Sequence, residues 1–111
     1  MVSAVLHSSI RTLNDEFRQT FVGGRVMMTD GINALPDVIK AQVLSSVRQF
    51  TDFTPDDDSH GEHDFGAFEV DGEKFFWKID YYDKSLDAGS ENPADPAITT
   101  RVLMIMLASD Y

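Results

Sequence analysis

Apolar side chains recur every three or four residues in the first part of the chain, which is the spacing of one face of a helix. This stripe consists of Leu6, Ile10, Leu13, Phe17 and Phe21. We expect a helix of about four turns that ends at Gly23-Gly24, because glycine accepts the left-handed backbone common at helix ends. Its polar side is expected to carry Arg11, Asn14, Asp15 and Arg18.

A second run at helical spacing begins after Pro36 and extends to Phe50. A proline in the first turn is compatible with a helix, since its missing N–H would have no partner there. Between the two helices, residues 25–29 are rich in strand-forming side chains and are followed by Asp30-Gly31. This short segment predicts a strand.

Two strand-like runs, residues 64–70 and 73–82, flank Asp71-Gly72. This dipeptide predicts a tight type I′ hairpin, because aspartate and glycine accept the positive φ angles of that turn. In the second run Phe75, Trp77, Ile79 and Tyr81 alternate with Phe76, Lys78, Asp80 and Tyr82. We expect the first set to face the core and the second to be at least partly exposed.

Residues 96–109 are apolar on most of their circumference, and Asp95 and Pro96 resemble a helix cap and first turn. They predict a third, deeply buried helix. The expected fold is therefore α+β, in the order α-β-α-β-β-α. It is a small antiparallel sheet of about three strands, including one tight hairpin, covered by three helices. Residues 1–111 are expected to form a single domain.

The net charge of −10 is concentrated in the middle of the chain. Residues 52–95 hold fourteen acidic and three basic side chains, a balance of −11, whereas residues 1–51 balance to +1 and residues 96–111 to zero. An acidic protein is repelled by nucleic acids and anionic membranes, so neither is an expected partner. A basic protein surface is the natural complement.

The chain contains no cysteine, no long apolar span and no basic start typical of a secretory signal. These features predict a cytoplasmic protein. They also exclude a zinc site made of thiolates. Whether the chain forms a homo-oligomer is left open by the sequence.

The segment His60-Gly-Glu-His-Asp64 is a candidate metal site, because His60, Glu62 and His63 are ligand types that zinc accepts. The usual zinc pair on a helix has a spacing of four, however, and a calcium loop would need an acid where Ala67 stands. A solvated acidic loop is the simpler interpretation. No cofactor is predicted.

Catalytic motifs are also weak. Asp80 and Asp83 with Tyr81 and Tyr82 offer carboxylates near a strand end, but there is neither a nucleophile elbow nor a phosphate-binding glycine loop. We therefore expect a protein that is not an enzyme.

Five segments carry a family resemblance, namely residues 10–15 (IRTLND), 23–29 (GGRVMMT), 60–66 (HGEHDFG), 75–82 (FFWKIDYY) and 95–107 (DPAITTRVLMIML). The chain resembles a small, uncharacterised bacterial family, a domain of unknown function often found near mobile genetic elements. Small acidic proteins in that setting resemble anti-restriction and anti-CRISPR inhibitors. This likeness is one of type, and it supplies no catalytic residues.

Two hypotheses follow. In the first, an acidic module mimics DNA and binds the basic groove of a partner, such as a nucleic-acid-binding CRISPR effector complex. The residues expected to bind this partner are Asp56, Asp57, Asp58, Glu62, Asp64, Asp80, Asp83, Asp87 and Glu91. In the second, His60, Glu62 and His63 bind a metal or a small ligand. An inert acidic surface that only keeps the domain in solution is the third interpretation.

Overall fold

The computed structural model describes the backbone of residues 2–111 and the side chains of residues 9–111. In chain order its elements are α1 (Val2–Thr20), β1 (Gly24–Met28), α2 (Asp30–Asn33), α3 (Asp37–Arg48), β2 (Phe65–Val70), β3 (Glu73–Tyr82), β4 (Thr100–Leu107) and the 3-10 turn η1 (Ala108–Asp110). The first two predicted helices and the predicted first strand are confirmed. The side chain of Leu6, which belongs to the predicted stripe, lies outside the described side chains.

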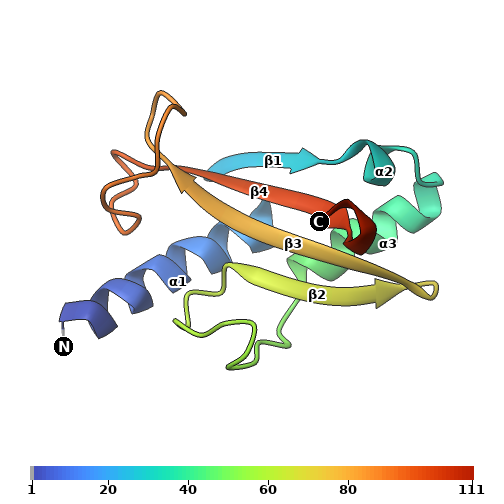
Figure 1. Cartoon of the computed structure of the whole chain (residues 1–111), viewed down its shortest axis with the longest axis horizontal. Helices are drawn as coiled ribbons and strands as arrows, with labels where there is room; N and C mark the ends of the chain where they lie inside the picture. Colours follow the sequence, from blue (N-terminus) through green and yellow to red (C-terminus); the bar gives the residue numbers. More distant parts are fainter. Residues whose placement is uncertain (1) are drawn as a thin grey trace.

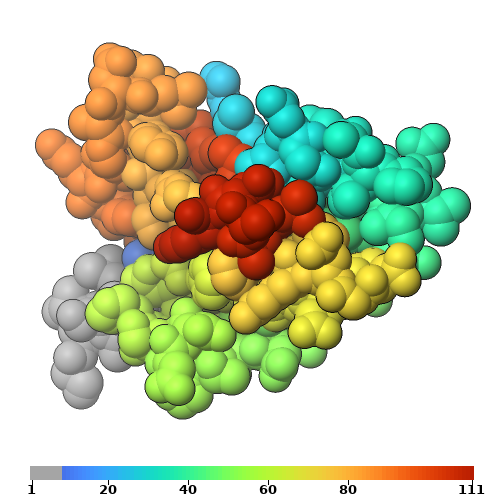
Figure 2. Space-filling view, turned by 45° about the vertical axis from the view of Figure 1, so that its right-hand side comes forward, coloured from blue at the N-terminus to red at the C-terminus, as the bar shows by residue number. Residues whose placement is uncertain are grey.

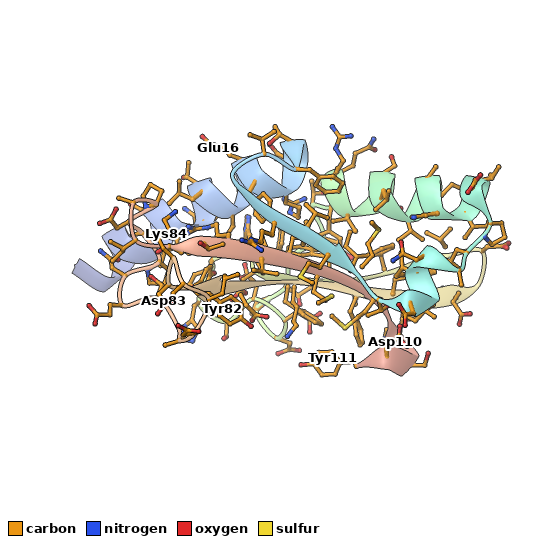
Figure 3. The ribbon with its side chains drawn as sticks, turned by 90° about the horizontal axis from the view of Figure 1, so that it is seen from above. Glu16, Tyr82, Asp83, Lys84, Asp110 and Tyr111 are labelled. Atoms are coloured by element: carbon orange, nitrogen blue, oxygen red, sulfur yellow. The ribbon has the colours of Figure 1, made fainter. Side chains whose placement is uncertain are left out.

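The four strands form one mixed sheet in the order β1-β4-β3-β2. β4 pairs in parallel with β1 and antiparallel with β3, and β2 and β3 form the predicted hairpin. Asp71 and Gly72 have φ angles of 54° and 78°, as the type I′ turn requires. Both long helices, α1 and α3, lie against the same face of the sheet (Figures 1 and 3). The molecule therefore has two layers.

The predicted helix 96–109 is wrong, because β4 occupies its central part and runs through the middle of the sheet. Leu103 and Ile105 are fully buried on the helix side, and Val102 and Met106 are almost fully buried on the other side. A central strand that is buried on both faces has a continuous apolar sequence, which periodicity cannot distinguish from a buried helix.

This difference corrects the expected fold class. The sheet has four strands instead of about three, it is mixed instead of antiparallel, and the element order is α-β-α-α-β-β-β instead of α-β-α-β-β-α. Asp95 and Pro96 do not start a helix. The Asp95 carboxylate instead accepts a hydrogen bond from the Ala97 N–H (2.9 Å) in a local turn.

The core lies between the sheet and the two long helices. Phe75, Trp77 and Ile79 of β3 point toward Phe17 of α1 and Val47 of α3, and all five are buried. The pairing of β2 with β3 depends on Gly66, since a Cβ atom at this position would lie within 2.3 Å of the Trp77 indole nitrogen. The burial of Phe75, Trp77 and Ile79 confirms the predicted core face of β3.

Candidate functional site

Most of the predicted partner-binding residues lie in two loops at one end of the sheet. Residues 51–64 connect α3 to β2, and residues 83–99 connect β3 to β4. We call these segments the acidic loops. In Figure 1 they lie on either side of α1, near the end of β3 and the start of β2. The predicted residues that are exposed in these loops are Asp56, Asp57, Asp87 and Glu91.

Asp83 shapes the second acidic loop. Its carboxylate accepts hydrogen bonds from the Ser85 hydroxyl (3.0 Å) and from the Asp87 N–H (3.1 Å). These hydrogen bonds favour the charged carboxylate and therefore lower the pKa of Asp83. The bond from the Ser85 hydroxyl is the largest cause of the lowered pKa. A backbone bridge between Tyr82 and Gly89 closes the loop at its base. Asp83 therefore acts within the loop and leaves Asp87 at the surface.

Asp80 lies apart from the acidic loops. It projects from the face of the sheet opposite the helices, where its carboxylate pairs with Lys78 Nζ at 3.0 Å. The hydrogen bond from Lys78 to Asp80 raises the pKa of Lys78. The carboxylates of Asp80 and Asp83 thus serve different local contacts, one with a lysine on the sheet and one within a loop.

One buried asparagine on α1 connects both acidic loops. The Asn14 Nδ2 group donates to the Glu62 carbonyl oxygen (3.0 Å) in the first loop and to the Tyr81 hydroxyl (2.8 Å). The Asn14 Oδ1 atom accepts a hydrogen bond from Arg101 Nε (2.8 Å). Arg101 in turn donates from Nη2 to the Pro93 carbonyl oxygen in the second loop. Asn14 and Arg101 are 0% and 3% exposed, so the link runs through the protein interior.

Burial controls the charges around this link. It raises the pKa of the Tyr81 hydroxyl far above its ordinary value, so that the neutral phenol accepts from Asn14 and donates to Glu62 Oε1 (3.4 Å). It also lowers the pKa of Arg101, whose guanidinium lies over the Tyr81 ring at 5.3 Å. The same physical cause raises the pKa of Asp64, with a further contribution from the Glu62 charge.

A second set of contacts fixes the first acidic loop to α1. His63 has a positive φ of 55°, and its N–H donates to Asp58 Oδ1 (2.9 Å). The imidazole stacks on Phe53 with a centroid distance of 3.6 Å. Its Nδ1 lies 2.9 Å from Asp15 Oδ1, and its Nε2 lies 3.6 Å from Asp58 Oδ2. Asp58 is thus part of the support of the loop, and its side chain is only 6% exposed.

Arg18 connects this set to the end of α3. Its Nη2 donates to Asp15 Oδ1 (3.1 Å), and its Nη1 donates to the carbonyl oxygens of Val47 and Phe50, both at 3.0 Å. A cation at a helix C-terminus satisfies carbonyl groups that have no partner within the helix. Burial lowers the pKa of Arg18. α1, α3 and the first acidic loop are therefore held by one polar cluster.

These contacts also place the residues of the metal hypothesis. Both ring nitrogens of His63 face carboxylates, Glu62 contacts the Tyr81 hydroxyl, and His60 is exposed. Within residues 9–111, no group of three or more histidine, aspartate or glutamate side chains is placed to hold a metal ion. The geometry therefore assigns His63 and Glu62 to loop anchoring.

The sequence analysis missed the buried polar cluster. Asn14 and Arg18 were expected on the polar side of α1, yet they are 0% and 1% exposed. A signal was present, because Asn14 follows the buried Ile10 by four residues and Arg18 follows Asn14 by four, so that both fall within the buried arc. Arg101 had no comparable signal, since its segment was interpreted as a helix.

The family described as "Protein of unknown function (DUF3768)" matches residues 28–110. Because this match covers most of the chain, the protein belongs to that family, and the predicted membership of an uncharacterised family is confirmed. No curated protein and no solved structure gives a significant match. Within the described residues, none of the helices has the length and apolar character needed to cross a bilayer.

Proposed function

We propose that this DUF3768 protein is a non-enzymatic binding module that docks its acidic loops onto a basic surface of another protein. The surface that makes contact consists of the exposed carboxylates of Asp56, Asp57, Asp87 and Glu91. The observation that carries the proposal is the shared anchor of the two loops. Through Asn14 and Arg101, both loops are attached to one buried link, which holds the loop backbone in a fixed arrangement at Glu62 and Pro93.

A fixed arrangement matters because ordering a loop on binding has an entropic cost. Loops that are already held in place avoid part of that cost. Spaced carboxylates also attract arginine and lysine side chains over a distance of roughly 8 Å at physiological salt. Association through this surface is expected to be fast at low salt and to weaken as salt is added.

The most specific form of the proposal concerns the partner. Protein grooves that bind nucleic acids are lined by lysine and arginine, and a surface of spaced carboxylates competes with phosphates for them. We therefore expect the partner to be a nucleic-acid-binding defence complex, inhibited in the manner of a DNA mimic of the anti-CRISPR type. This step rests on charge and on resemblance of type.

The test compares two triple variants that remove equal charge. Asp56→Asn/Asp57→Asn/Asp87→Asn neutralises three exposed carboxylates of the acidic loops, and Glu69→Gln/Asp71→Asn/Glu73→Gln neutralises three exposed carboxylates near the hairpin turn. Binding to an arginine-rich peptide is measured by calorimetry, and displacement of labelled duplex DNA from a purified CRISPR effector complex is measured by anisotropy. We expect the loop variant to be roughly tenfold weaker in both assays, at about 0.5 kcal/mol for each exposed contact.

The hairpin variant is the matched control and is expected to bind like the unaltered protein. Equal weakening of both variants would contradict a role for the acidic loops, because only overall charge would then matter. Peptide binding without displacement of DNA would contradict the DNA-mimic form of the proposal. The more general proposal, a module that binds a basic protein surface, would still hold. No binding by the unaltered protein in either assay would contradict both the binding-module proposal and its DNA-mimic form.

A further inference from the structure

Among the described residues, the face of the sheet opposite α1 and α3 is largely uncovered, apart from the 3-10 turn η1 and Tyr111 at one end. It is formed by residues 25 and 27 of β1, by residues 65, 67 and 69 of β2, and by the even-numbered residues of β3 and β4. We call this surface the open face. In Figure 3, Tyr111 and Asp110 lie on this side of the sheet, and the two long helices lie on the other. The sequence had predicted that the even-numbered side of β3 would be partly exposed, which is confirmed.

The open face exposes large apolar side chains. Met27 is 50% exposed at its β1 edge, and Tyr111 is 75% exposed where the chain ends over the Phe76 ring. Figure 2 shows residues 108–111 standing out between the α2 region and the β2–β3 hairpin. Leu86 of the second acidic loop is 36% exposed and borders the same face. Large apolar side chains that are exposed on one face of a protein are candidates for contact with another protein.

Two hollows lie side by side on the open face. One has a volume of about 410 Å³ and is lined by Met27, Tyr82 and Val102, among others. The other has a volume of about 370 Å³ and is lined by Met106 and Tyr111, among others. Lys78 and Met104 line both hollows, so they adjoin at the centre of the sheet. Methionine side chains adapt their shape to a partner, which suits them to such a surface.

The charge of the open face bears on which kind of partner it can accept. Its basic side chains are Arg25, Lys74 and Lys78. Its acidic side chains are Glu69 and Asp80, and Asp110 of η1 adds a third carboxylate at its margin. The face is thus neutral in a chain whose net charge is −10. A strongly charged partner gains nothing here, whereas a second copy of the chain meets no repulsion from the face itself.

We infer that a second copy of this chain covers the open face in a two-fold symmetric, sheet-to-sheet dimer. In such an interface the same surface is used twice, so a pair of unlike charges must complement itself. Lys78 and Asp80 meet this requirement, since they are neighbours on β3 at the centre of the face. In the dimer, Lys78 of each copy faces Asp80 of the other, beside the exposed Met27 and the partly exposed Met104.

The size of the sheet is compatible with a dimer of modest affinity. Strands lie about 4.8 Å apart and rise about 3.3 Å per residue, so four strands of roughly eight residues cover about 500 Å² in projection. Standard interfaces bury about 800 Å² of accessible surface on each side, which is of the same order once the relief of the side chains is included. The first acidic loop lies outside both hollows, so the dimer leaves its carboxylates available, whereas the second acidic loop borders the open face at Leu86.

The experiment measures mass by sedimentation equilibrium across protein concentrations up to about 100 μM, a range that detects micromolar dimers. The unaltered protein is expected to reach twice its monomer mass of 12.4 kDa. Met27→Lys is expected to weaken association at least about tenfold, because it places an unpaired charge in the apolar contact. Val38→Lys is the matched control, since Val38 is 69% exposed on α3 and the added charge is the same.

A charge swap tests the symmetry. Lys78→Asp and Asp80→Lys each place like charges opposite one another and weaken the dimer, whereas the double variant Lys78→Asp/Asp80→Lys restores it. Circular dichroism and urea unfolding check that each variant remains folded. A monomeric unaltered protein would overturn the inference, and so would a dimer that Met27→Lys and the single swaps leave unchanged. None of these changes touches the acidic loops, so the outcome is separable from that of the proposed function.

Discussion

The two faces of the sheet differ in how deeply the side chains of the same strands are buried. On the helix-covered face, Phe75 and Trp77 are completely buried, and even the polar groups of Asn14 and Arg101 are withdrawn from water. On the open face, the neighbouring residues Phe76 and Lys78 remain partly exposed. Stability is therefore concentrated on one side of β3, whereas the side chains on the other side and in the acidic loops are more exposed to solvent.

The polar contacts differ in the same way. The Asn14–Arg101 link lies in the interior and joins segments 87 residues apart, whereas Lys78 and Asp80 are two positions apart with side chains 39% and 41% exposed. Buried hydrogen bonds are costly to leave incomplete, whereas exposed ion pairs contribute little. The interior link therefore sets the shape of the loops, and the exposed pair remains available to exchange partners.

The largest expected effect comes from adjacent phenylalanines on β3. Phe75→Ala removes a side chain that is 0% exposed, and we expect it to lower the free energy of unfolding by about 3–5 kcal/mol. Phe76→Ala is expected to cost about 1–2 kcal/mol, because its ring is only partly buried. Urea unfolding in the Met27→Lys background, where the open face is free, measures both. Equal losses would mean that the two faces contribute alike to stability.

The next effect concerns the buried link. Asn14→Ala leaves Arg101 Nε and the Glu62 carbonyl oxygen without their partner, and the expected cost is about 1–3 kcal/mol. Asp80→Ala, which removes the exposed ion pair, is expected to cost less than about 1 kcal/mol. Amide hydrogen exchange should accelerate in both acidic loops of Asn14→Ala.

A matched variant on the same helix is Glu16→Ala, whose side chain is exposed and which should leave the exchange of both loops unchanged. Faster exchange in residues 51–64 alone would contradict the connection of the second loop through Arg101.

The smallest effect is a pH dependence at Asp64. Burial raises the pKa of Asp64 in the folded protein, so its contribution to stability is fully present below the unfolded pKa and is lost as pH rises through the folded value. Asp64→Asn removes this loss. We expect the variant to be slightly more stable than the unaltered protein at pH 7 and to lose this advantage at pH values below about 4.

Urea unfolding across this pH range measures the difference, with exposed Asp56→Asn as the control. An Asp64→Asn variant that is less stable than the unaltered protein at pH 7 would show that the carboxylate gains more from its contacts than it loses by burial.

The sequence predicted those parts of the site that depend on local chemistry. The acidic loops were recognised from their composition, and four of the nine residues expected to bind a partner are exposed loop carboxylates. The others act in local contacts that composition cannot distinguish. Asp58 supports His63, Asp83 closes its own loop, and Asp80 belongs to the sheet. The exposed carboxylates can be distinguished from those in local contacts only when the atoms near each carboxylate are known.

By itself, the sequence determined the helices α1 and α3 and the hairpin between β2 and β3. Each depends on interactions within a few residues, such as helical spacing or the positive φ of Gly72. Only the tertiary structure decided that residues 100–107 form a strand, since an apolar run fits a helix or a central strand equally well. The parallel partner β1 and the antiparallel partner β3 bury that strand on both sides. The same placement brings Arg101 to Asn14 and so creates the link between the acidic loops.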